Sequence, residues 1–226
     1  TLHNTLFPYT TLFRSILRDT AWTDALVDAA DHGRERGQEV CLHTHFNTPE
    51  EITFITREAM DVLFRRGVKV RNQSVLIRGV NDHPERMIRL VRRLSHINVQ
   101  PYYVYQHDMV KGVEELRTSL ADSIELERSV RGSTAGFNTP TFVTDAPGGG
   151  GKRDLHSHDH YDETTGISIY RSPSVDADEY YVYYDPLDRL PAAGRRRWED
   201  PAEHPKMVRE AVLAAGLSGH RPALPL

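Results

Sequence analysis

The stretch "VKVRNQSVLIRGVNDHPERMIRLVRRLSHINVQPYYVYQ" (residues 68–106) decides the expected fold. Residues 68–77 and 99–106 are rich in β-branched and aromatic residues, which predicts two strands. Between them, Met87, Leu90, Val91 and Leu94 recur at three- and four-residue spacing, which predicts a helix with one apolar face. A strand, a helix and a second strand in this order are typical of a right-handed crossover between parallel strands.

The alternation of strands and helices continues on both sides of this stretch. Helices are expected over residues 24–38, 49–67 and 119–132, and strands over 39–46 and 140–143. Thr48 is expected to cap the second of these helices and Pro49 to open it. No strand leads into a GxGxxG turn, which argues against a dinucleotide-binding domain. We therefore predict an α/β fold, a partial (β/α) barrel that occupies residues 16–153.

The composition excludes several classes of protein. The 226 residues carry a formal charge of −4, which does not suggest a nucleic-acid-binding protein. No apolar run reaches the ~18 residues that a membrane span needs. Cys41 is the single cysteine, so the chain has no internal disulfide framework and cannot by itself build an all-cysteine metal site. We expect a cytoplasmic protein.

The two ends of the chain differ from the middle. "TLFPYTTLFRS" (residues 5–15) resembles a translated sequencing adaptor, so we interpret residues 1–15 as a non-native scar, with a mobile natural terminus as the alternative. Under the first interpretation, the natural protein begins upstream and this chain is a fragment. Residues 154–226 are predicted to be a C-terminal appendage. It would contain a hairpin over 167–187 and a helix over 202–215.

Polar side chains recur where the predicted strands end, which is where barrel enzymes carry their functional residues. They are His43, His45 and Asn47; Asn72, Gln73 and Ser74; Tyr105, Gln106, His107 and Asp108; and Asp145 with the run that ends at Lys152.

The last of these strand ends reads "TDAPGGGGK" (residues 144–152). A phosphate-binding P-loop is excluded, because Ala146 replaces its first glycine and Arg153 follows the lysine. A flexible linker stays open, but the run follows a strand directly. Gly148, Gly149, Gly150 and Gly151 would allow close backbone approach to a ligand. Lys152 would then present an amine able to form a Schiff base with an aldehyde such as pyridoxal phosphate.

Two further pairs of side chains have more than one interpretation. His43 and His45 point to the same face of a strand, but the sequence offers no clear third metal ligand, so we predict no metal site. "HSHDH" (156–160) is interpreted as a solvated loop.

Asp108 and Asp145 end consecutive strands and should reach the same edge of the sheet. Together they would serve as acid and base, as metal ligands, or as partners for an ammonium group.

The motifs "THFN", "RNQSVL", "GVND", "PYYVYQHD" and "PTFVTDAPGGGGK" together resemble the lysine 2,3-aminomutase family, over residues 39–152. The resemblance implies a radical S-adenosylmethionine barrel that uses pyridoxal 5′-phosphate and a [4Fe-4S] cluster. It implies that Lys152 carries the pyridoxal phosphate and that Tyr105 lies beside the cofactors. It also implies that Asp108 and Asp145 bind the distal ammonium of the substrate, and that His45 and Gln73 line the S-adenosylmethionine site.

The implied reaction is the isomerisation of L-lysine to L-β-lysine by a 1,2 amino migration. The CxxxCxxC motif that holds the family's cluster is absent from this chain, so the fragment is expected to be inactive alone. Position 83, a cysteine in zinc-binding members, is His here, which is a further reason to expect no zinc. We expect a homo-oligomer at full length. The alternatives are an aminomutase for arginine or another amino acid, a non-catalytic pyridoxal-phosphate-binding relative, and a metal-dependent hydrolase built on His43, His45 and the aspartates.

Overall fold

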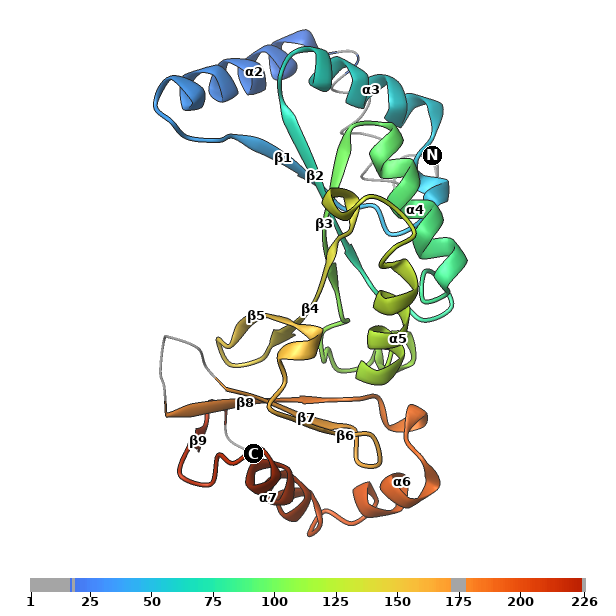
Figure 1. The fold of residues 1–226 in the computed structure, drawn as a ribbon, viewed down its shortest axis with the longest axis vertical. Helices are drawn as coiled ribbons and strands as arrows, with labels where there is room; N and C mark the ends of the chain where they lie inside the picture. The colour runs from blue at the N-terminus through green and yellow to red at the C-terminus, as the bar shows by residue number, and fades with distance from the viewer. Residues whose placement is uncertain (1–16, 18, 172–177, 225–226) are drawn as a thin grey trace, which may run out of the picture. The chain divides into compact units, whose positions relative to one another are not determined.

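The computed structural model describes residues 17, 19–171 and 178–224 (Figure 1). The predicted scar, residues 1–15, lies outside the described residues. The chain divides into two compact units that interleave along the sequence. Unit 1 comprises residues 1–74, 85–102 and 132–140, and unit 2 comprises 75–84, 103–131 and 141–226. The boundary predicted at residue 153 stays a prediction.

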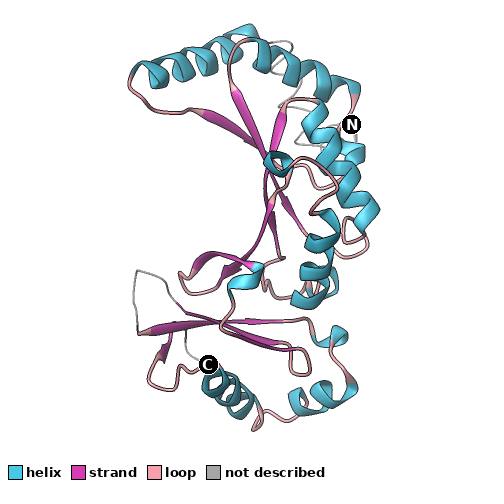
Figure 2. Cartoon of the chain, viewed as in Figure 1, coloured by secondary structure: helices cyan, strands magenta, loops and turns pink. Residues whose placement is uncertain are grey.

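The described residues form helices and strands in two sheets, shown by class in Figure 2. The helices are α2 (Thr20–Glu35), α3 (Phe54–Arg65), α4 (Pro84–His96), α5 (Leu120–Val130), α6 (Ala192–Trp198) and α7 (His204–Ala214). The strands are β1 (Cys41–Thr44), β2 (Lys69–Val75), β3 (Val99–Tyr105), β4 (Thr141–Ala146), β5 (Gly151–Asp154), β6 (His160–Asp162), β7 (Ile167–Arg171), β8 (Glu179–Tyr184) and β9 (Arg221–Pro222).

The first sheet has the strand order β1-β2-β3-β4-β5. β1 and β2 are parallel, as are β3 and β4, with Thr44 opposite Asn72 and Tyr105 opposite Val143. β5 is antiparallel to β4. The predicted α/β class, with helices between parallel strands, is confirmed. Whether these strands belong to a barrel stays a prediction.

Unit 1 is built around the amphipathic helices that the sequence pattern indicated. On α4 the predicted apolar residues Met87, Leu90, Val91 and Leu94 are at most 1% exposed. One helix start was predicted wrongly. Pro49 opens a short 3-10 turn, Pro49–Glu51, and α3 begins only after Thr53, whose hydroxyl accepts a hydrogen bond from the Thr56 amide at 3.3 Å. The chain is extended at Thr53, so the turn and α3 are separate elements, and the Thr53 side chain caps the second of them.

Unit 2 contains the second sheet, of order β6-β7-β8-β9. β7 and β8 are antiparallel, which confirms the predicted hairpin, although the turn at residues 172–177 lies outside the described residues. α7, which confirms the helix predicted over 202–215, packs against one face of this sheet. Within unit 2, β4 and β5 carry the residues of the candidate site.

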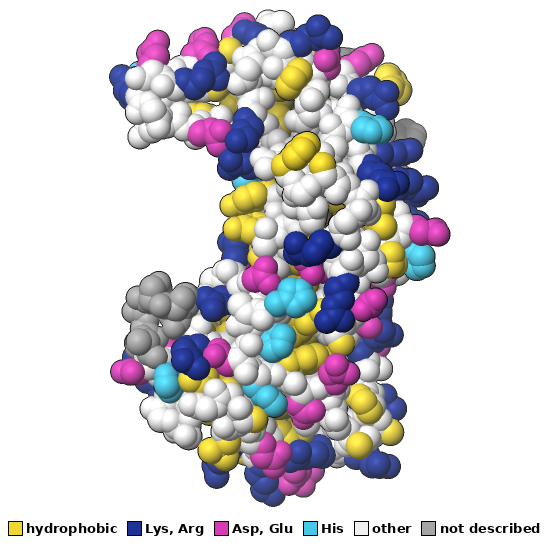
Figure 3. Space-filling model, viewed as in Figure 1, with side chains coloured by type: hydrophobic (Ala, Val, Ile, Leu, Met, Phe, Trp, Pro, Cys, Tyr) yellow, Lys and Arg dark blue, Asp and Glu magenta, His cyan; other side chains and the backbone are white. Residues whose placement is uncertain are grey.

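The side chains on the face drawn in Figure 3 are mainly polar, with acidic and basic residues interspersed. Many of them form ion pairs on the surface, such as Arg86 and Arg89 with Glu50 in unit 1. Among the described residues, no helix is both long and apolar enough to cross a membrane.

Candidate functional site

The glycine run forms the turn of a hairpin, and this turn places Lys152 opposite Asp145. β4 ends at Ala146, the Gly150 amide donates to the Ala146 carbonyl at 3.1 Å, and β5 begins at Gly151. Gly148, Gly149 and Gly151 have φ of 89°, 97° and 70°, a region that residues with a side chain rarely adopt. Asp145 and Lys152 are therefore direct cross-strand partners. The sequence had placed them only at the two ends of one turn.

The Lys152 amine lies between a carboxylate and an aromatic ring. Lys152 Nζ is 3.9 Å from Asp145 Oδ2, and both side chains keep almost half of their exposure, 45% and 42%. The same Nζ lies 5.6 Å from the ring centre of Tyr105, which ends β3 beside β4. An ammonium is attracted to the face of such a ring. The structure thus brings Lys152, Asp145 and Tyr105 together, and their roles stay predictions.

Asp108 lies in the loop that follows β3, and its side chain is exposed to solvent. The start of this loop is held against β4 by Gln106, which is 1% exposed. The backbone amide of Gln106 donates to the Val143 carbonyl at 2.7 Å, and the side-chain Oε1 of Gln106 accepts from the Thr144 hydroxyl at 2.7 Å. Gln106 therefore has a structural role. It fixes the loop that carries Asp108 at the same end of the strands as Asp145.

His45 and Gln73 belong to unit 1, whereas Lys152 belongs to unit 2. Because Thr44 pairs with Asn72, His45 and Gln73 are the next residues along two paired chain segments. Both are half-buried. Burial lowers the pKa of His45, and the charge of Glu51 opposes this shift only in part. The imidazole is therefore neutral at pH 7 and can either donate or accept a hydrogen bond.

The other polar residues at the end of β2 are used by the fold itself. Asn72 and Ser74 are 1% and 2% exposed. Asn72 Oδ1 accepts from the Phe46 amide at 2.7 Å and from the Thr44 hydroxyl at 3.0 Å, and Asn72 Nδ2 donates to the Phe46 carbonyl at 3.1 Å. Ser74 donates to the same carbonyl at 2.7 Å. These two side chains hold the chain after β1 in place and are structural.

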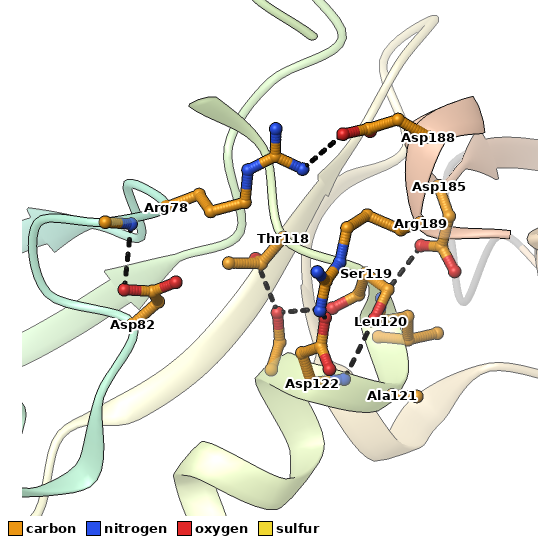
Figure 4. A network of polar contacts seen from close by, with 12 residues as sticks. Arg78, Asp82, Thr118, Ser119, Leu120, Ala121, Asp122, Asp185, Asp188 and Arg189 are labelled. Atoms are coloured by element: carbon orange, nitrogen blue, oxygen red, sulfur yellow. Dashed lines mark hydrogen bonds and ion pairs between the residues drawn. The ribbon is translucent and has the colours of Figure 1, made fainter. Parts of the chain in front are cut away.

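A second polar cluster lies at the start of α5 (Figure 4). Asp185 is 3% exposed, accepts from the Leu120 amide at 2.8 Å and accepts from the Tyr161 hydroxyl at 2.6 Å. Burial raises the pKa of Asp185 to about 6, against the lowering effect of these two hydrogen bonds. The Ser119 hydroxyl caps α5 by accepting a hydrogen bond from the Asp122 backbone amide. The Asp122 carboxylate in turn forms an ion pair with the Arg189 guanidinium, at 2.8 Å. The backbone amides of Leu120 and Asp122, in the first turn of α5, thus donate their hydrogen bonds to side chains of the protein.

Asp185 is a buried polar residue that could not be identified from the sequence. Its partner Leu120 is distant in the sequence and lies in another element, so no local spacing connects the two residues. The one signal was the position of this aspartate before Pro186, directly after a strand rich in tyrosine.

The residues present fit some of the implied groups and not others. Lys152 offers an exposed amine beside an aromatic ring, which suits the aldehyde and the ring of pyridoxal phosphate. His45 and Gln73 offer polar side chains suited to a polar cofactor. Cys41 alone does not fit a [4Fe-4S] cluster, which needs several thiolates. Among the described residues, no group of three or more His, Cys, Asp or Glu side chains is placed to hold a metal ion.

Comparisons with known proteins agree with the motif analysis. Residues 126–160 match the family described as lysine-2,3-aminomutase. The chain is 51% identical over 113 residues to L-lysine 2,3-aminomutase of Clostridium subterminale, an alignment that covers 50% of this chain and 27% of the relative. The protein of the same name from Acetoanaerobium sticklandii is 50% identical over 113 residues, with the same coverage. Glutamate 2,3-aminomutase of Clostridioides difficile is 42% identical over 116 residues, 51% of this chain and 28% of the relative.

The chain thus aligns with less than one third of the length of these relatives. The resemblance to the lysine 2,3-aminomutase family is therefore confirmed over about half of this chain.

Proposed function

We propose that this chain is the C-terminal part of a 2,3-aminomutase that uses pyridoxal phosphate and S-adenosylmethionine to convert L-lysine into L-β-lysine. One observation carries the proposal. The hairpin places the Lys152 amine 3.9 Å from Asp145 and over the ring of Tyr105, within a chain whose relatives are named aminomutases.

Lys152 would hold the cofactor. Pyridoxal phosphate supplies an aldehyde that bonds to an amine and a conjugated ring that spreads an unpaired electron. The Tyr105 ring lies beside the amine, and the glycines of the turn carry no side chain that would obstruct a planar ligand. Of the four lysines in the chain, Lys69 and Lys206 instead form close ion pairs with Glu39 and Glu203, at 3.0 and 2.7 Å.

Asp145 and Asp108 would bind the side-chain ammonium of the substrate. A partly buried ammonium needs neutralising partners, and two carboxylates at one edge of the sheet provide them. One relative is named a glutamate 2,3-aminomutase, so similarity to the relatives does not by itself identify the substrate. An anionic side chain would be repelled by these two aspartates, which favours a cationic substrate. Arginine is the alternative.

Radical generation would depend on residues outside this chain. His45 and Gln73 would contact S-adenosylmethionine, whereas the cluster that cleaves it needs cysteines that the chain does not contain. We therefore propose that the 226-residue chain holds the cofactor but does not turn over substrate alone.

The first experiment tests the role of the lysine. The chain is incubated with pyridoxal phosphate and reduced with borohydride, and the modified lysine is identified by peptide mapping. We expect Lys152 to be modified in preference to Lys69, Lys111 and Lys206, and the visible absorbance of the bound cofactor to vanish in the Lys152→Ala variant. An unchanged spectrum in that variant would remove Lys152 from this role.

The second experiment tests the reaction and the substrate. A protein in which this chain continues upstream into a cluster-binding region is reconstituted with the cluster and both cofactors. We expect it to convert L-lysine and to leave L-glutamate unchanged. Conversion of arginine without lysine would overturn the substrate assignment. If the upstream coding sequence contains no CxxxCxxC motif, the radical reaction is lost and the non-catalytic alternative is favoured.

A further inference from the structure

The second sheet of unit 2 presents a face of tyrosines to the elements of the candidate site. Side chains alternate along β7 and β8, so that Ile167, Ile169 and Tyr180 pack against α7. The opposite face carries Tyr170, Tyr181 and Tyr183, which are at most 3% exposed and cluster with Ala146 of β4. Both faces of this sheet are therefore buried. One face packs against α7, and the tyrosine face packs against β4, which carries Asp145 of the candidate site.

Two of these tyrosines hold the residues that directly precede the aspartates. The Tyr183 hydroxyl donates to the His107 carbonyl at 2.6 Å, one residue before Asp108. The Tyr170 hydroxyl donates to Thr144 Oγ1 at 3.3 Å, one residue before Asp145. Each phenol hydroxyl reaches a polar group, the backbone carbonyl of His107 or the hydroxyl of Thr144, while the ring fills the apolar space beside β4.

The third tyrosine packs against the glycine turn. A methyl group added at Gly150 would lie 2.7 Å from Tyr181 Cγ and 2.7 Å from the Ala146 Cβ. On another part of the same turn, a methyl at Gly148 would lie 2.9 Å from the side chain of Leu224. The run of glycines therefore serves more than backbone freedom. Without a side chain at Gly150, the turn can lie directly against Tyr181 of the second sheet. Without a side chain at Gly148, the turn can lie directly against Leu224.

We propose that Tyr181 is a positioning residue for Lys152, and that Tyr170 and Tyr183 position the segments of Asp145 and Asp108 in the same way. This inference rests on the proposed function. Because Gly150 is two residues before Lys152 and cannot move toward Tyr181, the ring sets the path of the turn. The start of β5, and with it the amine opposite Asp145, follows from that path.

The test uses the 226-residue chain and measures the rate at which pyridoxal phosphate is fixed on each lysine by borohydride. We expect Tyr181→Ala to slow the modification of Lys152 about ten- to a hundred-fold, since displacement of a reacting group by about 1 Å has effects of this size. Lys111, which is exposed and outside the hairpin, is the internal control and should react at an unchanged rate.

A conservative variant separates positioning from the loss of a hydrogen bond. Tyr181 acts through its ring, because its hydroxyl contacts only Glu179 at a long 3.4 Å among the bonds described for it. Tyr181→Phe should therefore restore the rate of the unmodified chain. Circular dichroism confirms that each variant is folded. If Tyr181→Ala does not fold, Gly150→Ala is used instead, because its methyl group would push the same turn away from the Tyr181 ring. Gly136→Ala is the control for this variant, because a methyl group at Gly136 would meet nothing within 4 Å.

The outcomes distinguish this inference from the proposed function. If Lys152 of the unmodified chain does not react with the cofactor, the proposed function is lost and the inference with it. If Lys152 reacts equally fast in the unmodified chain, in Tyr181→Ala and in Gly150→Ala, only the positioning role of Tyr181 is overturned. A slow Tyr181→Phe would also overturn it, because the ring would then not be the part that acts.

Discussion

The ends of β2 and β4 carry polar side chains at similar positions, but the two groups are used differently. At the end of β2, Asn72 and Ser74 are almost fully buried and bonded to the chain around Phe46. At the end of β4, Asp145 and its cross-strand partner Lys152 are almost half exposed and 3.9 Å apart. A position at the carboxyl end of a strand is thus not sufficient to identify a functional residue.

Solvation explains the difference. A buried amide or hydroxyl must find hydrogen-bond partners within the protein, because leaving it without them costs about 1–3 kcal/mol. Asn72 satisfies this requirement with the backbone of Phe46, and little of its bonding capacity is left for a ligand. Asp145 and Lys152 are still in contact with water, so a ligand can replace that water without breaking a bond on which the fold depends.

The largest expected effect on stability is at the end of β2. Asn72→Ala removes the acceptor of the Phe46 amide and the donor to the Phe46 carbonyl inside the protein. We expect the free energy of unfolding to fall by about 3 kcal/mol, the usual consequence of breaking a buried hydrogen-bond network. Urea unfolding monitored by circular dichroism measures this change.

The neighbouring Gln73 provides a matched control. It lies on the same strand but is only half-buried, so Gln73→Ala should change the free energy of unfolding much less. Equal losses in the two variants would show that burial does not separate structural from candidate functional residues at this strand end.

Asp185 is a third case, a buried acid whose charge itself opposes folding. Burial raises its pKa from 3.8 to about 6, so the folded chain holds this proton more tightly than the unfolded chain. The group adds stability below about pH 4, and that contribution is lost as the pH rises through about 6. At about 1.4 kcal/mol per pKa unit, the loss is about 3 kcal/mol at pH 7.

The Asp185→Asn variant has no proton to lose. We therefore expect its free energy of unfolding, relative to the unmodified chain, to increase by about 2 kcal/mol between pH 4 and pH 7. The hydrogen bond that the Asn Nδ2 atom cannot accept lowers the free energy of unfolding equally at both pH values and cancels from this difference. Urea unfolding at the two pH values measures it. All other titrating groups are shared, so a constant difference between the two chains would contradict the raised pKa.

Much of the fold could be predicted because it is recorded in local periodicity. The apolar face of α4 and the alternation in β7 and β8 are visible in the sequence and are found in the structure. β5 was missed because "GKRD" has no apolar face, and its residues are mostly exposed. It is a strand only because it pairs with β4, and pairing between strands is not visible in a four-residue pattern.

Lys152 could be named as a candidate from the chemistry of its side chain alone, and its role stays a prediction. Residues whose partners are distant in the sequence could not be named in this way. "HSHDH" was interpreted as a solvated loop, yet His156 Nε2 lies 2.8 Å from Glu127 Oε2 of α5, a residue that is 3% exposed. The tyrosines of the second sheet form a regular pattern in the sequence, but nothing local indicates which segments their hydroxyl groups contact.

The smallest expected effect on stability is at the candidate site itself. Asp145→Asn removes the charge opposite Lys152 but keeps the shape of the side chain. Exposed ion pairs contribute about 0–1 kcal/mol, and at 3.9 Å this pair should be at the lower end, so we expect a change in the free energy of unfolding below about 0.5 kcal/mol.

Under the proposed function, the same variant should nevertheless lose preference for a cationic substrate, because only Asp108 would remain to neutralise the ammonium. Urea unfolding of the chain measures the first effect, and the separate rates of lysine and glutamate turnover in the reconstituted protein measure the second. A loss of stability as large as that of Asn72→Ala would make Asp145 a structural residue. The exposure of its side chain would then carry no information about function, and the contrast between the ends of β2 and β4 would disappear.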